Sequence, residues 1–210
     1  MEPLILIGGG GHCRSAIDVI EAESKWNIVG ITDQKENMGN TVSGYEIIAP
    51  DEELPELISK YKHCLVTVGQ LKSAALKRKL FEMAAGYGAT LPVVESPHAV
   101  VSNHAQLGSG TIIFHHAVVN SGAVIGANCI INTGAILEHD VTVGDHVHIA
   151  PGAVVNGHCR VGSRSLIGSG AIVVQQVEIG ENVIIGAGSV VNRSITEPGI
   201  YAGVPAKKIS

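Results

Sequence analysis

The sequence predicts two structural parts in series: an α/β half-Rossmann unit, followed by an all-β parallel β-helix built from hexapeptide repeats. Two observations support this fold class. A glycine-rich turn follows an apolar run near the N-terminus, and branched aliphatic residues recur at every sixth position from 107 to 191. We expect the first part to span residues 1–97 and the second, which includes a C-terminal tail, to span residues 98–210.

The N-terminal part alternates strands and helices. Residues 3–23, PLILIGGGGHCRSAIDVIEAE, predict a strand, a glycine turn and a helix whose buried side carries Ile17 and Ile20. The alternation continues with a strand at 26–33, a strand at 63–69, a helix at 73–88 and a strand at 89–102. Such an alternation indicates a parallel sheet of the Rossmann type.

The glycine turn indicates a phosphate-binding loop. Backbone N–H groups of such a turn can approach a phosphate at a helix N-terminus, and Asp33, at the end of the second strand, is placed to bind ribose hydroxyls. The run from Gly8 to Gly11 lacks the GxGxxG spacing, and about 95 residues are too few for a full dinucleotide domain. A ligand with one nucleotide, such as a nucleotide sugar, therefore fits better than NAD.

The repeat in the second half predicts its architecture. Every sixth residue is a branched aliphatic, the residue two places earlier is nearly always small, and Gly or Asn commonly follows. A period of six excludes a helical array, in which aliphatic residues would recur with a period near 3.6. The aliphatic column consists of Leu107, Ile113, Val119, Ile125, Ile131, Leu137, Val143, Ile149, Val155, Val161, Ile167, Val173, Ile179, Ile185 and Val191.

Two inward residues followed by a corner, repeated every six residues, predict a three-sided coil with three units per turn. The units then form about five coils, joined by hydrogen bonds from coil to coil around an aliphatic interior. Cys129 and Cys159 fall in the small inward column. We expect them, like Cys13 and Cys64, to be reduced thiols, because the chain has no CxxC pair.

Charge and hydropathy exclude several classes of partner. The formal net charge is −5, and 16% of the residues are charged. These values argue against a nucleic-acid-binding protein, which needs a basic face to contact phosphates. The chain has no run of ~18 apolar residues and no signal peptide, so we expect a cytoplasmic protein without a membrane partner. Its ligands should be small molecules.

Three motifs together resemble a known enzyme family. They are GGGGH at residues 8–12, NTGAILEHD at 132–140 and GVPAK at 203–207. The combination resembles the sialic-acid O-acetyltransferases and bacterial UDP-4-amino-sugar N-acetyltransferases of the PglD/NeuD type, over essentially the whole chain. The resemblance implies a left-handed prism, acetyl-CoA as co-substrate, no metal, and a homotrimer whose active sites lie between subunits. It also implies a role in glycan biosynthesis, such as that of bacillosamine.

The resemblance also implies roles for individual residues. His139 would be the general base, Asp140 would raise its basicity, and His148 would contact acetyl-CoA. The residues expected along the CoA groove are Gly157, Ser169, Gly186 and Ala187, with Lys207 or Lys208 paired to a CoA phosphate. The residues expected around the nucleotide sugar are Gly10, Gly11, His12, Thr32, Asp33 and Gly69.

The chemistry of acyl transfer suits these residue types. An amine or hydroxyl that attacks a thioester must lose a proton, and histidine accepts one near neutral pH. A neighbouring carboxylate fixes the tautomer and stabilises the imidazolium. His139 lies two places after inward Leu137, at a corner, whereas His148 lies between inward residues and points outward. The histidines for which we expect no role are His115, His116, His146 and His158.

These observations favour acetyl transfer from acetyl-CoA to the amine of a nucleotide-linked 4-amino-4,6-dideoxy sugar, by direct attack without an acyl-enzyme. Transfer to a hydroxyl of sialic acid or a related nonulosonic acid is the nearest alternative. A metal enzyme of the γ-carbonic-anhydrase kind, also a left-handed β-helix, would need three histidines on a shared zinc ion. A nucleotide-sugar-binding scaffold without catalytic activity is a further interpretation.

Overall fold

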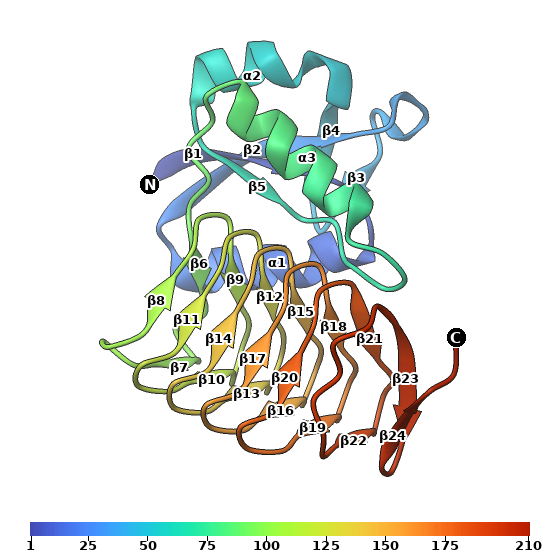
Figure 1. Cartoon of the computed structure of the whole chain (residues 1–210). Coiled ribbons are helices and arrows are strands. Elements are labelled where there is room, and N and C mark those ends of the chain that lie inside the picture. Colours follow the sequence, from blue (N-terminus) through green and yellow to red (C-terminus); the bar gives the residue numbers. More distant parts are fainter.

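The computed structural model describes all 210 residues and consists of an α/β unit that lies along one side of a three-sided β-prism (Figure 1). The unit contains a five-stranded sheet in the order β3-β4-β2-β1-β5, parallel except for the β3–β4 pair. Its strands are β1 (Glu2–Ile7), β2 (Trp26–Asp33), β3 (Thr41–Val42), β4 (Tyr45–Pro50) and β5 (Cys64–Val66). Its helices are α1 (Gly11–Glu23), α2 (Leu54–Tyr61) and α3 (Ala75–Gly86), with 3₁₀ turns η1 (Lys35–Asn37) and η2 (Asp51–Glu53).

Most elements of this unit lie where the sequence predicts them. α1, β2 and α3 match the expected segments, and the strand expected at 63–69 is shorter, ending at Val66. The hairpin β3–β4 and helix α2 were not predicted. They lie in a stretch rich in charged residues, where elements of two to eight residues give little periodic signal.

The prism has three sheets of short parallel strands, consistent with the expected left-handed β-helix. We name its faces by their surroundings. The covered face, beneath the α/β unit, holds β6 (Val94–Glu95), β9 (Ile112–Ile113), β12 (Ile130–Ile131), β15 (His148–Ile149), β18 (Leu166–Ile167) and β21 (Val183–Ile185). The apolar face holds β7 (Val100–Val101), β10 (Val118–Val119), β13 (Ile136–Leu137), β16 (Val154–Val155), β19 (Ile172–Val173) and β22 (Val190–Val191). The polar face holds β8 (Gln106–Leu107), β11 (Val124–Ile125), β14 (Thr142–Val143), β17 (Arg160–Val161) and β20 (Glu178–Ile179).

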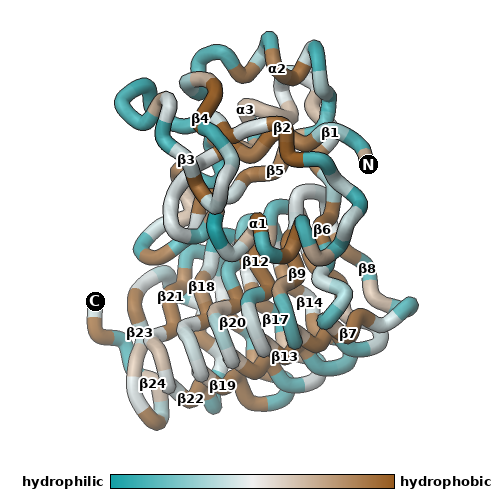
Figure 2. The backbone as a smooth tube through the Cα atoms, turned by 180° about the vertical axis from the view of Figure 1, so that it is seen from behind, coloured by the Kyte–Doolittle hydropathy of each residue, from teal (hydrophilic) through white to brown (hydrophobic).

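Equivalent residues of neighbouring coils are eighteen positions apart and pair directly, as Ile136 does with Val154. The inward columns form one core of 27 buried residues, in which Cys129 and Cys159 are both fully buried free thiols. The hydrophobic segments of this core recur along the strands of the prism (Figure 2). Backbone pairing between coils and the continuous aliphatic interior therefore hold the repeat together.

Residues 89–102, expected as one strand, form two strands of the prism instead. β6 pairs with β9 and β7 pairs with β10, so the sheets of the prism begin at Val94. This start lies slightly before the boundary expected after residue 97. At the other end the chain forms a hairpin of β23 (Gly199–Gly203) and β24 (Ala206–Lys208), which joins the covered face through β21.

The outward residues of the three faces differ in chemistry. On the polar face, charged and polar residues such as Arg160 and Glu178 alternate with the buried column. On the apolar face every outward residue is aliphatic, and Val100 and Ile172 are 64% and 41% exposed. The six outward residues of this face are Val100, Val118, Ile136, Val154, Ile172 and Val190.

The α/β unit packs on the covered face through α1 and α3. Apolar residues of α1, including Cys13 and Ile17, share a buried cluster with Phe114 and Ile130 of the prism. The α3 residue Lys77 is almost fully buried, and its Nζ donates a hydrogen bond to the carbonyl of Asn128 at 2.7 Å. Burial lowers the pKa of Lys77 to about 8. None of the α-helices combines the length and hydropathy needed to cross a bilayer.

Candidate functional site

A cavity of about 930 Å³ lies between the α/β unit and the prism. This volume is typical of sites for small molecules and cofactors. One wall carries the glycine turn and the ends of β2 and β5, and the other is built from the covered face and the corner where it meets the apolar face. We call residues 132–134, 150–152, 168–170 and 186–188 the covered–apolar corner. Predicted residues that line the cavity are Gly10, Gly11, His12, Asp33, Gly69, His148, Ser169, Gly186 and Ala187.

The glycine turn leaves backbone donors free at the start of α1. Gly10 is the N-cap residue, and no side chain accepts a hydrogen bond from the first turn of the helix. The first N–H groups of a helix have no partner within it, so they are available to an anion. Gly8 has a φ of +100°, and a Cβ there would clash with Val68, so glycine is required at this position.

Asp33 is held at the end of β2 by hydrogen bonds. Its carboxylate accepts from the N–H of Gly9 at 2.5 Å, the N–H of Gln34 at 2.6 Å and Nδ2 of Asn37 at 2.9 Å. Partial burial would raise the pKa of Asp33, but these hydrogen bonds, first that of Asn37, hold it below its ordinary value. The carboxylate is therefore charged and rigidly placed beside the cavity.

Thr32 does not line the cavity, in contrast to the expectation. Successive strand residues point to opposite sides of the sheet, and Thr32 is fully buried. Its hydroxyl donates a hydrogen bond to Asp51 at 2.9 Å, and Asp51 is the residue that reaches the cavity. Sequence reasoning missed Asp51 because it lies in the acidic run before α2, which carries no recognisable motif.

His12 and His148 come together under the α/β unit, with ring centroids 6.4 Å apart. Burial lowers the pKa of His148 to about 4. Burial, together with the nearby His148 and Lys77, lowers the pKa of His12 to about 4 as well. Both rings are therefore neutral at pH 7, and the Nε2 atom of His12 is buried without a hydrogen-bond partner.

Both ring nitrogens of His148 are occupied. Nδ1 donates to the carbonyl of Gln70 at 2.9 Å, and Nε2 lies 3.1 Å from the amide nitrogen of Asn132, from which it accepts. The Gln70 side chain in turn donates to the carbonyl of Ser165 at 3.3 Å. Gln70 and Asn132 also line the cavity; Asn132 opens the NTGAILEHD motif but was not assigned a role, and Gln70 lies in no recognised motif. His148 points outward from the prism as expected, but the α/β unit buries it.

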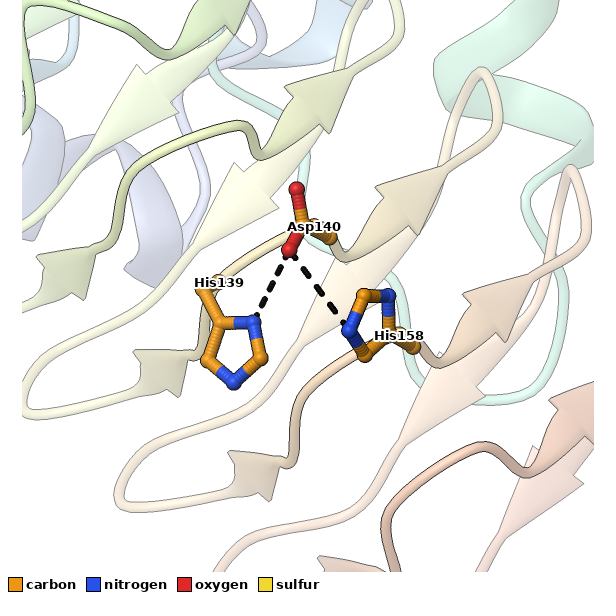
Figure 3. A group of neighbouring side chains, drawn as sticks. All are labelled: His139, Asp140 and His158. Carbon is orange, nitrogen blue, oxygen red and sulfur yellow. Dashed lines mark hydrogen bonds and ion pairs between the residues drawn. The ribbon is translucent and has the colours of Figure 1, made fainter.

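His139 and Asp140 lie at a different corner, between the apolar and polar faces (Figure 3). We call residues 120–122, 138–140 and 156–158 the apolar–polar corner. His139 Nδ1 donates to Asp140 Oδ2 at 2.9 Å, which leaves Nε2 as the acceptor of the neutral ring. This hydrogen bond lowers the pKa of Asp140 below its ordinary value. The side chains of His139 and Asp140 are 52% and 51% exposed, so solvent and ligands reach both.

Glycines of the neighbouring coils make room for this pair. Gly157 stacks one coil away from His139, and a Cβ there would lie 2.6 Å from His139 Nε2. Gly122 stacks one coil away from Asp140 on the other side, where a Cβ would clash with the carboxylate. The expected residue Gly157 thus supports the imidazole and does not line the cavity.

The two acidic residues beside His139 have different hydrogen-bond partners. Glu138 accepts a hydrogen bond from the side chain of Asn120 at 2.9 Å, whereas Asp140 bonds to His139. The third member of the corner is His158, whose Nε2 lies 3.7 Å from Asp140 Oδ2. His139 and His158 meet edge to face with ring centroids 5.0 Å apart (Figure 3).

Within one chain the cavity and the His139–Asp140 pair are separate. The cavity lies at one edge of the apolar face and the pair at the opposite edge, so neither residue is among the cavity lining. Lys207 is exposed on β24 and does not line the cavity either, while Lys208 forms an ion pair with Glu197 at 3.2 Å. A single chain therefore presents the cavity and the His139–Asp140 pair as two separate features.

Two family models match the chain. The PglD N-terminal domain matches residues 3–84, and the bacterial transferase hexapeptide, with six repeats, matches residues 122–157 and 158–193. No curated protein sequence matches the chain.

Several solved structures match over essentially their full length. A mutant of perosamine N-acetyltransferase from Caulobacter crescentus, in complex with CoA and GDP-perosamine, is 32% identical, with a TM-score of 0.94 over 100% of this chain and 98% of that one. The acetyltransferase domain of PglB from Neisseria gonorrhoeae, in complex with acetyl coenzyme A, is 33% identical, with a TM-score of 0.91 over 99% of each chain. WeeI from Acinetobacter baumannii, at 24% identity and a TM-score of 0.85 over both full chains, shares the fold.

Proposed function

This chain belongs to the family of acetyltransferases that join a PglD N-terminal domain to bacterial transferase hexapeptide repeats, and we propose that it acetylates the amine of a nucleotide-linked 4-amino-4,6-dideoxy sugar with acetyl-CoA. His139 is the general base of the proposed reaction. The observation that carries this proposal is the exposed His139–Asp140 pair, in which Nδ1 is committed to a carboxylate and Nε2 is free to accept a proton.

The cavity supports binding of the two substrates side by side. The free N–H groups at the start of α1 suit the diphosphate of a nucleotide sugar, and the charged Asp33 suits its ribose hydroxyls. The covered–apolar corner, including Ser169, Gly186 and Ala187, offers a groove of small residues for the pantetheine arm. Among its relatives, the enzyme from Caulobacter crescentus is bound to CoA and GDP-perosamine, and the domain from Neisseria gonorrhoeae to acetyl coenzyme A.

In the proposed enzyme a homotrimer brings the cavity and the His139–Asp140 pair together. The apolar face is the one face whose outward residues are all aliphatic, and a continuous patch of this kind marks an interface. In a cyclic assembly each copy contacts its neighbour through two different patches. Three prisms with their apolar faces toward a threefold axis bring the apolar–polar corner of one copy against the covered–apolar corner of the next. His139 of one subunit then lies beside the cavity of its neighbour.

The reaction then proceeds by direct attack. The sugar amine attacks the thioester carbonyl of acetyl-CoA, and His139 Nε2 takes a proton from the nitrogen as the tetrahedral intermediate forms. The C–S bond breaks, the acetyl group stays on nitrogen as an amide, and the CoA thiolate takes up the proton. Asp140 stabilises the imidazolium while it exists. His148 remains neutral and holds the shape of the cavity wall.

A thiol-release assay tests the proposed acceptor. Acetyl-CoA is combined with a panel of UDP-, GDP- and dTDP-linked 4-amino sugars and with free sialic acid. We expect one nucleotide-linked amino sugar to release CoA far faster than the others, with an N-acetyl product by mass spectrometry. Release with sialic acid alone would replace the amine by a hydroxyl acceptor, and no release with any acceptor would contradict the proposal.

The trimer is tested at two matched positions. Val154 points outward from the apolar face and Val124 points outward from the polar face. We expect Val154→Glu to convert trimers into monomers in light scattering and to abolish acetyl transfer, because a buried unpaired charge destabilises the interface. Val124→Glu serves as the control and should remain trimeric. A trimeric Val154→Glu protein would refute this arrangement.

A further inference from the structure

The apolar–polar corner contains a cluster of three side chains that could bind a metal ion, and one of the three has no role in the proposed reaction. His139, Asp140 and His158 each offer one ligand atom, and these atoms all lie within 4.8 Å of one another. No other three His, Cys, Asp or Glu side chains of the chain gather in this way. His158 has no part in the reaction described above, and the sequence suggested none for it.

The coil spacing explains why the three side chains converge. Asp140 and His158 are eighteen residues apart, so they occupy equivalent positions of successive coils. Both have left-handed backbones, with φ of 59° and 58°, and therefore leave the corner in a similar direction. His139 precedes Asp140 in the same turn, and its ring lies over Gly157, which presents no side chain between it and His158.

The residue types and separations suit a transition-metal ion. Zn²⁺ binds imidazole nitrogen and carboxylate oxygen at about 2.0–2.2 Å in tetrahedral geometry, which places neighbouring ligand atoms about 3.3 Å apart. The observed separations from Asp140 Oδ2 are 2.9 Å to His139 Nδ1 and 3.7 Å to His158 Nε2, which bracket that value, and all three ligand atoms lie within 4.8 Å of one another. The three side chains are each about half exposed, so an ion can enter and keep a water as its fourth ligand.

We propose that His139, Asp140 and His158 form a binding site for Zn²⁺ or a similar divalent transition-metal ion, which inhibits the enzyme. Metal binding to His139 Nδ1 displaces the proton from that nitrogen. The neutral ring then carries its proton on Nε2, which can no longer accept one from the substrate. The metal also takes the Asp140 carboxylate away from the imidazole. Inhibition rests on the proposed role of His139, whereas metal binding does not.

Metal binding is measured first, with CoA absent because its thiol would compete for zinc. Purified protein competes with a chromogenic chelator for Zn²⁺, and Mg²⁺, which prefers oxygen ligands, serves as a second probe. We expect one Zn²⁺ per chain and no binding of Mg²⁺. His158→Gln should weaken Zn²⁺ binding at least about tenfold, the scale on which even indirect partners of a metal affect affinity.

The matched control is His104→Gln. His104 lies two coils before Asp140 in the same column of the same corner and is exposed, but it is not part of the group. We expect this variant to bind Zn²⁺ like the wild type. The four cysteines are buried and should not contribute. Equal Zn²⁺ affinities for the wild type and His158→Gln would overturn the site.

Inhibition is measured next, from initial rates of acetyl transfer at rising Zn²⁺, with each variant compared with its own metal-free rate. We expect half-inhibition of His158→Gln to need at least about tenfold more Zn²⁺ than the wild type, and His104→Gln to match the wild type. Unchanged rates in wild-type protein that is saturated with Zn²⁺ would overturn the inhibition. A His139→Asn variant with full turnover would instead refute the proposed base, while the binding data would still decide the site.

Discussion

Two regions of the molecule each hold a pair of histidines, and the pairs differ in every property that matters for proton transfer. His12 and His148 lie between the α/β unit and the covered face, where burial lowers both pKa values to about 4. His139 and His158 lie at the apolar–polar corner, where each side chain is about half exposed and both approach Asp140.

The comparison shows that a proton acceptor needs a free nitrogen that also takes up a proton readily. His12 has a free Nε2, but burial lowers its pKa to about 4. Gln70 and Asn132 occupy both nitrogens of His148, so this ring can shape the cavity but cannot accept a substrate proton. His139 commits only Nδ1, to Asp140, and keeps Nε2 accessible. These differences support the proposal that the apolar–polar corner supplies the base, while the two histidines beneath the α/β unit stay neutral beside the cavity.

Replacing His139 should give the largest effect. We expect His139→Asn to lower kcat by about 10² or more, the usual contribution of a general base. Binding of the nucleotide sugar, measured by calorimetry, should be retained because the cavity lining does not include this residue. His116→Asn, at an exposed position of another corner, is the control and should keep wild-type turnover. Wild-type turnover in His139→Asn would contradict the proposed base and remove the functional difference between the two pairs.

Acidification should destabilise the fold through the two histidines that lie between the α/β unit and the prism. The folded protein holds His12 and His148 at a pKa of about 4, against 6.5 in an unfolded chain, so only the unfolded state takes up protons between these values. The free energy of unfolding should therefore fall as the pH is lowered from about 6.5 to about 4. One such histidine accounts for roughly 3 kcal/mol at full protonation.

Urea unfolding at pH 7 and pH 4.5 measures this loss. His148→Gln removes one titrating group, so the difference between the two pH values should be smaller in this variant than in the wild type. Identical differences in the two proteins would show that His148 does not titrate as its burial implies.

Adding one methyl group at Gly157 should give a smaller effect. The Cβ of Gly157→Ala would lie 2.6 Å from His139 Nε2, so the imidazole must move, although the fold can accommodate a displaced surface side chain. We expect kcat to fall about tenfold while the melting temperature stays close to that of the wild type. Gly86→Ala, where nothing lies within 4 Å of the added Cβ, controls for the substitution itself. Unchanged turnover in Gly157→Ala would mean that the imidazole works from another position.

The sequence was sufficient for the prism because its signal is periodic. An aliphatic at every sixth position fixes which side chains point inward, and the eighteen-residue coil then determines which residues stack, as Gly157 does on His139. The hairpin β3–β4 and helix α2 have no such redundancy. Their few buried residues, such as Val42 and Ile58, have polar neighbours in the sequence, and their burial depends on packing against the rest of the α/β unit.

The site residues also fall into those that the repeat predicts and those that depend on tertiary contacts. The corner position of His139 follows from the repeat, but the choice of Asp140 over Glu138 as its partner depends on Asn120, one coil away, which takes Glu138. The burial of His148 and the contribution of Asp51 to the cavity depend on how two separately folded parts dock. No local sequence pattern predicts this contact between the α/β unit and the prism.

The cavity has one wall from the α/β unit and one from the prism, and these walls belong to chain segments that follow one another without interleaving. In the proposed enzyme, substitutions in the loops of the first segment can thus alter the choice of sugar without changing the coils proposed to bind the thioester. An architecture of this kind lets evolution diversify acceptors by exchanging one module, with the chemical step inherited intact.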